Sequence, residues 1–120
     1  MKPHLHAKNS ARKYGGKPEE YQAYHDFFDQ TKALEASVKH RALLHSAWGI
    51  FLLEQVFGKT MTNSEGKVVS IRDIGEDHVL EDLGFIPSAS DYLKHMNIAP
   101  WMSGTERGLK TKRRTIPLVD

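Results

Sequence analysis

The strongest constraint on the fold is a periodic stripe of apolar residues in the middle of the chain. Apolar side chains recur there in steps that fit one face of an α-helix, and Gly58 stands where such a helix can end. The pattern predicts one long helix over about residues 30–57. Its buried stripe contains Ala36, His40, Leu43, Ala47, Ile50, Glu54 and Phe57. We expect the middle of this stripe, around Leu43, to be the centre of stability.

Shorter elements are predicted on both sides of this helix. Pro18 can open a preceding helix, in which Tyr21, Tyr24 and Phe28 share one face. Residues 59–71 read as a β-hairpin with its turn at 63–66. The sequence then predicts a short helix over about 76–83, ended by Gly84.

The region after Gly84 is predicted to pack against the helices. A further helix opens near Pro87 and should turn Tyr92, Leu93 and Met96 inward. Residues 100–102 read as a docked apolar plug, and residues 105–120 have little to bury.

The length of 120 residues fits one domain. The predicted fold is mainly α, a single small helical domain around one long central helix, with one β-hairpin. We expect a basic N-terminal arm at 1–17, the helical domain with its hairpin near 59–71 at 18–104, and a basic C-terminal tail at 105–120.

The composition excludes several classes of site. The chain has no cysteine, which excludes disulfides, thiolate metal sites and cysteine nucleophiles. Its longest apolar run, 47–53, is far shorter than the roughly 20 residues of a membrane-spanning helix, and no signal peptide is recognisable. We therefore expect a cytoplasmic protein without membrane contact.

Basic residues gather at both ends of the chain, although the net charge is only +2. Such clusters can bind nucleic acid or an acidic protein, or lie solvated on their own domain. The C-terminal candidates for partner contact are Arg107, Lys110, Lys112, Arg113 and Arg114. The oligomeric state is left open, a dimer included.

Seven histidines are the feature that can carry chemistry. In a chain without thiolates, a transition metal must use imidazole and carboxylate ligands. His78 and Asp82 are four residues apart on the predicted short helix, with Glu81 near the same face. The alternative is a solvated acidic helix with an ordinary His78–Asp82 pair.

His40 is the second candidate ligand because it lies on the buried stripe, where an unpaired polar group is unfavourable. It can equally be satisfied within the core. His25, four residues before Asp29, or His45 can join as a further ligand. His4 and His6 are expected on an extended arm, where alternate side chains point the same way.

Two family resemblances can be recognised. Residues 42–46 resemble the metal-binding helix of histidine–aspartate phosphohydrolases, in which an Asp follows the His, whereas this chain has Ser46 after His45. The second resemblance spans about residues 6–102, in blocks such as 14–16, 40–43, 49–51, 62–64, 74–76, 81–84 and 100–102. These blocks resemble an uncharacterised family of small bacterial and phage proteins, a domain of unknown function, and imply that the tail lies outside the shared domain.

The leading functional hypothesis is a divalent-metal-binding protein, with the further hypothesis of a metal-dependent hydrolase. The metal would be Zn, Ni or Mn, held by His40, His78 and Asp82 with His25 or His45, and Glu81 would act as base. The competing hypothesis is a non-catalytic binding protein that contacts nucleic acid or an acidic protein through its basic termini.

Overall fold

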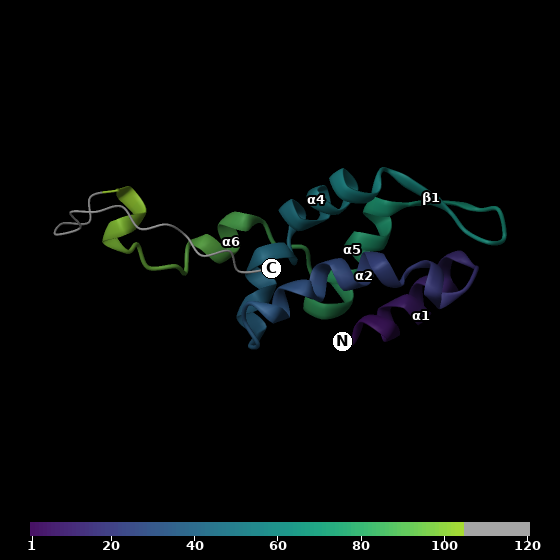
Figure 1. The fold of residues 1–120 in the computed structure, drawn as a ribbon, viewed down its shortest axis with the longest axis horizontal. Coiled ribbons are helices and arrows are strands. Elements are labelled where there is room, and N and C mark those ends of the chain that lie inside the picture. Colours follow the sequence, from purple (N-terminus) through teal and green to yellow (C-terminus); the bar gives the residue numbers. More distant parts are fainter. Residues whose placement is uncertain (105–120) are drawn as a thin grey trace.

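The computed structural model describes residues 1–104 and shows a mainly helical domain with one small hairpin (Figure 1). Its longer helices are α1 (Pro3–Tyr14), α2 (Gln22–Asp29), α4 (Ala47–Phe57) and α5 (Ile71–Leu83). The shorter elements are η1 (Pro18–Glu20), η2 (Gln30–Ala33), η3 (Val38–His40), α3 (Arg41–Leu44), β1 (Thr60–Thr62), β2 (Val68–Ser70), α6 (Ala89–Leu93) and η4 (Pro100–Ser103). The predicted fold class is confirmed. None of the helices within 1–104 is long and apolar enough to cross a bilayer.

The long helix expected over 30–57 is interrupted, so that detail of the prediction was wrong. The chain leaves α3 at His45, whose ψ of 68° is not helical, and α4 begins after the cap residue Ser46. The hydroxyl of Ser46 accepts a hydrogen bond from the backbone N–H of Gly49. Gly49 is required here, because a Cβ at this position would lie 1.6 Å from the carbonyl oxygen of Leu44.

The break changes which residues form the core. Leu43, expected at the centre of the buried stripe, is 49% exposed, and Ala47 is also exposed. Leu53 is buried instead, together with Ile50 of the same helix. The rest of the core comes from several elements: Ala7, Tyr21, Phe28, Val69, Ile71, Ile74 and Val79.

The hairpin forms where the sequence predicts it, and α5 contains the predicted short helix. Met61 pairs with Val69 in the antiparallel ladder, and Gly66 has a positive φ in the turn. The helix expected at 76–83 starts earlier, at Ile71, because the hydroxyl of Ser70 caps the N–H of Asp73. It ends at Gly84, in the left-handed conformation.

The N-terminal segment is helical, so the extended conformation expected for His4 and His6 was wrong. Helix α1 contacts α2 and α5, and its residues His6, Ala7 and Ser10 are buried. Lys13 forms an ion pair of 2.9 Å with Asp77 of α5, which helps to hold the two helices together.

The segment after α5 is more exposed than the sequence predicts. A helix, α6, opens after Pro87 as expected, with Ser88 as its cap. Leu93 is nevertheless 56% exposed and Met96 53% exposed. Trp101 is 62% exposed, so the predicted docking of the apolar plug is wrong for the described chain.

Candidate metal centre

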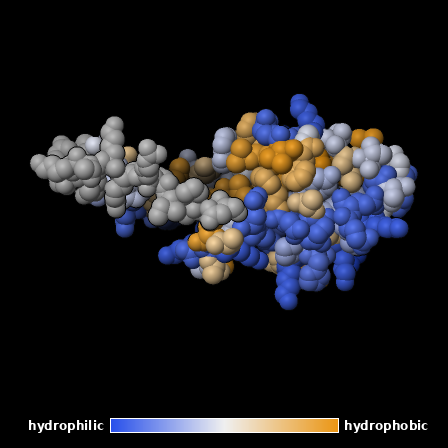
Figure 2. Space-filling model, in the orientation of Figure 1, coloured by the Kyte–Doolittle hydropathy of each residue, from blue (hydrophilic) through white to orange (hydrophobic). Residues whose placement is uncertain are grey.

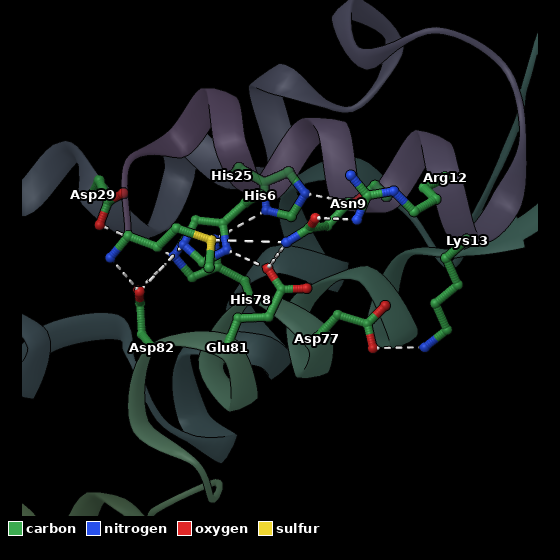
Figure 3. A network of polar contacts seen from close by, with 12 residues as sticks. His6, Asn9, Arg12, Lys13, His25, Asp29, Asp77, His78, Glu81 and Asp82 are labelled. Carbon is green, nitrogen blue, oxygen red and sulfur yellow. Dashed lines mark hydrogen bonds and ion pairs between the residues drawn. The ribbon is translucent and has the colours of Figure 1, made fainter.

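Four histidines are completely buried and lie close together in the interior, and Figure 3 labels three of them, His6, His25 and His78. His6 comes from α1, His25 from α2, His45 from the break between α3 and α4, and His78 from α5. The rings of His6 and His78 are stacked with their centroids 3.8 Å apart. A cluster of buried imidazoles needs polar partners, because an unpaired polar group in the interior is destabilising.

Two of these histidines converge with two aspartates. Asp82 Oδ2 lies 3.1 Å from His45 Nε2 and 3.3 Å from His78 Nε2. Asp29 Oδ1, at the end of α2, lies 3.6 Å from His45 Nε2 and 4.0 Å from His78 Nε2. We call Asp29, His45, His78 and Asp82 the four-residue centre; their ligand atoms all lie within 4.8 Å of one another.

The spacing of the four-residue centre fits a metal ion. In a tetrahedral site with bonds of about 2.0–2.1 Å, neighbouring ligand atoms are about 3.4 Å apart. The distances of 3.1 to 4.0 Å between these nitrogen and oxygen atoms bracket that value. Three buried atoms of these residues, His78 Nε2, Asp29 Oδ2 and His45 Nδ1, have no hydrogen-bond partner. Such unpaired atoms are unfavourable unless an ion or a water molecule satisfies them.

A second layer of hydrogen bonds orients His78. Its Nδ1 lies 2.9 Å from Nδ1 of His25, and Nε2 of His25 lies 2.7 Å from the hydroxyl of Ser10. With Nε2 of His78 on a metal, the proton of this ring is on Nδ1 and is donated to His25. His25 then carries its proton on Nε2 and donates it to Ser10. This series of hydrogen bonds leaves the lone pair of His78 Nε2 pointing at the centre.

The second carboxylate oxygen of Asp82 faces positive groups. The amino group of Met1 donates to Oδ1 at 2.7 Å, and His6 Nε2 and Arg41 Nη2 lie 3.3 and 3.8 Å away. Glu81, expected as a base, instead lies 2.6 Å from Nδ1 of His6. Asp82 therefore joins the four-residue centre to a His6–Glu81 pair.

The pKa values follow from burial and from these contacts. Burial alone would raise the pKa of Asp82, but the contacts with His45, His6 and His78 hold that pKa far below its usual range. Burial is the main cause that lowers the pKa of His78 to about 4. Burial, with His78 and His6 nearby, lowers the pKa of His25 to about 2. Both rings are thus neutral at pH 7, the form in which imidazole binds a metal.

His6 behaves differently from its neighbours. Burial would lower the pKa of His6, but the hydrogen bonds to Asp82 and Glu81 outweigh it and raise that pKa. A ring that favours its protonated form competes poorly for a cation. The His6–Glu81 pair is accordingly better suited to anchor Asp82 than to hold the ion.

Some of the predicted site residues lie in or next to the four-residue centre, and others lie outside it. His78 and Asp82 lie together as expected, with His45 beside them and His25 directly behind His78. His40 lies outside the four-residue centre, and its Nδ1 is 2.9 Å from the Thr31 hydroxyl. Its pKa is lowered, mainly by burial. The candidate partner contacts in the C-terminal tail, Arg107, Lys110, Lys112, Arg113 and Arg114, lie outside the described residues.

Sequence reasoning missed two members of this network, Asp29 and His6. Asp29 directly precedes the helix predicted over about residues 30–57, but it forms no side-chain cap bond there and its carboxylate lies at the centre. The spacing of four between His25 and Asp29 was the available signal, since it puts both on one face of α2. His6 gave no comparable signal, because the polar pattern of 1–17 hides the helix that buries it.

Comparison with known families assigns most of the chain, residues 1–102, to one family. A family model, a domain of unknown function (DUF6915), matches residues 1–102. The chain belongs to this family. The DUF6915 match includes α1 and every residue of the four-residue centre, and the resemblance expected over about 6–102 is confirmed. Comparisons with curated proteins and with solved structures found no match.

Hollows large enough for a small ligand lie away from the four-residue centre of this DUF6915 domain. One of about 310 Å³ lies between α4 and α5, a second of about 450 Å³ between α2 and α4, and a third of about 320 Å³ beside α1. None of these three is lined by Asp29, His45, His78 or Asp82.

Proposed function

We propose that this protein binds a divalent transition metal through Asp29, His45, His78 and Asp82. The observation that carries the proposal is the convergence of two imidazole Nε2 atoms and two carboxylate oxygens at 3.1 to 4.0 Å. Two nitrogen and two oxygen donors in a compact set suit Zn²⁺ best. Ni²⁺ and Mn²⁺ accept the same donors but prefer more of them, so we expect weaker binding of these ions.

The burial of the ligands favours a structural ion. The side chains of His45 and His78 are fully buried, and those of Asp82 and Asp29 are 1% and 8% exposed. A structural zinc site uses four protein ligands, whereas a catalytic one keeps a position for water. We therefore infer that the ion stabilises the packing of α2, α3 and α5.

The hydrolase hypothesis would need one ligand to make way for water. Asp29 is the candidate, since it is the most exposed ligand and makes the longest distances in the centre. Glu81 would then not be the base, because it is engaged with His6. Metal-dependent hydrolysis remains the second candidate function, and binding of nucleic acid or an acidic protein by the basic termini stays a prediction.

The test is a metal titration of chelator-treated protein, followed by thermal melting, calorimetry and elemental analysis. We expect about one Zn²⁺ per chain and stabilisation by RT ln(1 + [L]/Kd), about 2.7 kcal/mol at a free concentration of 100 times Kd. His45→Ala and Asp82→Asn should abolish the stabilisation.

His40→Ala is the matched control, because His40 is also buried but lies outside the four-residue centre. It should lower the melting temperature of the metal-free protein and keep the zinc-dependent increment. Absence of bound metal and of any zinc-dependent shift in the wild type would contradict the proposal. Equal loss of zinc binding in His40→Ala and His45→Ala would contradict the ligand set.

A further inference from the structure

The end of the described chain forms an apolar arm, which we define as residues 93–103. Its large side chains are strongly exposed: Leu93 is 56% exposed, Met96 53%, Ile98 85%, Trp101 62% and Met102 45%. The arm leaves the helical body beside α6 and extends away from it (Figure 1). Its backbone hydrogen bonds are local, such as Met96 N–H to Leu93 and Met102 N–H to Ala99.

A second apolar surface lies on the body, along α4. Trp48 and Phe51 stack with their ring centroids 5.3 Å apart and are 52% and 46% exposed. Phe51 also lines the hollow of about 310 Å³ between α4 and α5, together with Ile50 and Ile86. We call the surface formed by Trp48 and Phe51 the α4 face; Figure 2 shows hydrophobic residues gathered over α4.

The size of the two surfaces matches a dimer interface. A large aromatic side chain buries about 150–250 Å² in full, so half-exposed side chains offer on the order of 100 Å² each. The five side chains of the arm and the two of the α4 face then expose roughly 700 Å² per chain. That is about the area per partner in a standard stable interface. Exposed apolar patches of more than a few hundred Å² mark sites of association.

The direction of the arm favours a second copy over the chain's own body. The arm points away from the body, so covering its own α4 face would require the chain to reverse between Lys94 and Pro100. Contact with another copy needs no such reversal. The family match continues through Met102, so the arm is part of the shared domain rather than of the tail beyond it.

We propose that two copies of this chain form a two-fold dimer in which the arm of each lies on the α4 face of the other. Such a contact is reciprocal and closed, as a symmetric dimer requires. Trp101 is the anchor, because its indole suits the apolar side of the hollow between α4 and α5, which Ile50, Phe51 and Ile86 form. Glu54 and Glu76, which line the same hollow, can accept the indole N–H.

Sedimentation equilibrium of the full chain tests this proposal. We expect twice the chain mass of 13.6 kDa at micromolar concentration. Trp101→Asp and Phe51→Asp should each raise the dissociation constant at least 100-fold. Val68→Asp is the matched control: Val68 is 63% exposed but lies on the hairpin, outside both surfaces, and its substitution should leave the dimer intact. A monomeric wild type, or a dimer unaffected by both test variants, would overturn the proposal.

Cross-linking identifies what occupies the α4 face, because the chain has no cysteine of its own. Ser103→Cys labels the arm and Arg72→Cys the rim of the hollow. A mixture of the two single variants should give a disulfide-linked dimer on oxidation. A third sample carries both substitutions in one chain. If a disulfide forms only there, and within a monomer, the arm lies on its own body and the proposal is overturned. Loss of the dimer on truncation after Gly104 would also overturn it, in favour of the tail.

Discussion

Asp82 carries more contacts than any other side chain in the centre, and its two oxygens do different work. Oδ2 faces His45 and His78, while Oδ1 faces the Met1 amino group, His6 and Arg41. A buried carboxylate with so many cationic or polar neighbours stays ionised. In the metal-free protein, the Asp82 carboxylate offsets the unfavourable free energy of burying the surrounding imidazole rings. With a metal bound, it would supply negative charge to the ion.

The metal-free protein should lose stability as the pH falls. The pKa values of His78, about 4, and His25, about 2, lie below the roughly 6.5 of an unfolded histidine. Below pH 6.5 the unfolded chain therefore binds more protons, which favours unfolding. The raised pKa of His6 acts in the opposite direction, because it adds stability that is lost as the pH rises. Because two strongly lowered pKa values oppose one raised value, we expect a net loss of stability between pH 7.5 and 5.

Urea unfolding in the presence of a chelator at both pH values measures this loss. His95→Ala is the control, since His95 is exposed and its removal should leave the pH dependence unchanged. An unfolding free energy that is equal at the two pH values, or higher at pH 5, would contradict the prediction.

At the residue scale, the sequence predicts the part of the centre that is local. His78 and Asp82 share one turn of one helix, so spacing alone brings them together. Asp29 and His45 reach the centre only through the packing of α2 and α3 on α5, which no spacing rule contains. His40 was misplaced for a related reason: the stripe correctly predicts its burial but not its partner, Thr31.

At the scale of elements, the break between α3 and α4 matters most for the site. Residues 41–57 are apolar at helical spacing on both sides of the break, so periodicity predicts a continuous helix. The break is fixed by tertiary contacts: Ala47 N–H donates to the Pro87 carbonyl, and the Tyr92 hydroxyl donates to the carbonyl of His45. It turns the His45 ring into the interior.

Gly49→Ala distinguishes the broken from the continuous helix by the sign of its effect. In a continuous helix this change would stabilise by about 1 kcal/mol. Here the new methyl would collide with the Leu44 carbonyl, 1.6 Å away. We expect destabilisation of about 3 kcal/mol or more, measured by urea unfolding. Gln55→Ala, at an exposed position of the same helix, should stay within about 0.5 kcal/mol of the wild type.

Two leucines of the same region should differ strongly in how much their substitution by alanine lowers the free energy of unfolding. Leu53 is fully buried and Leu43 is 49% exposed. We expect Leu53→Ala to lower the unfolding free energy by about 2–5 kcal/mol, and Leu43→Ala by less than about 1 kcal/mol. The periodic stripe predicts the reverse order, so chemical denaturation of the pair decides between the stripe and the structure.

At the scale of the whole molecule, the hairpin makes the centre possible. It reverses the chain after α4, so that α5 packs back on α2 and α4. Gly75 allows this close approach, since a Cβ there would lie 2.9 Å from a methyl carbon of Leu53. The sequence predicts the hairpin and the reversal, but not that α1 would close the remaining side.

The domain should fold without its C-terminal tail. The family match ends at Met102, and the apolar core comes from residues 7–79. A chain ending at Gly104 should keep the far-UV circular dichroism of the full protein and melt within about 3 °C of it. Failure of this truncated chain to fold would show that the tail contributes to the core.

Burial of all four ligands has a consequence for how an ion would arrive. With these side chains at most 8% exposed, an ion could neither enter nor leave without a transient separation of the helices. Exchange would then follow the rate of that opening rather than the strength of the bonds. The protein would then retain the metal that is available when the helices first pack together. The identity of the bound metal would depend on the metals present during folding as well as on their affinities.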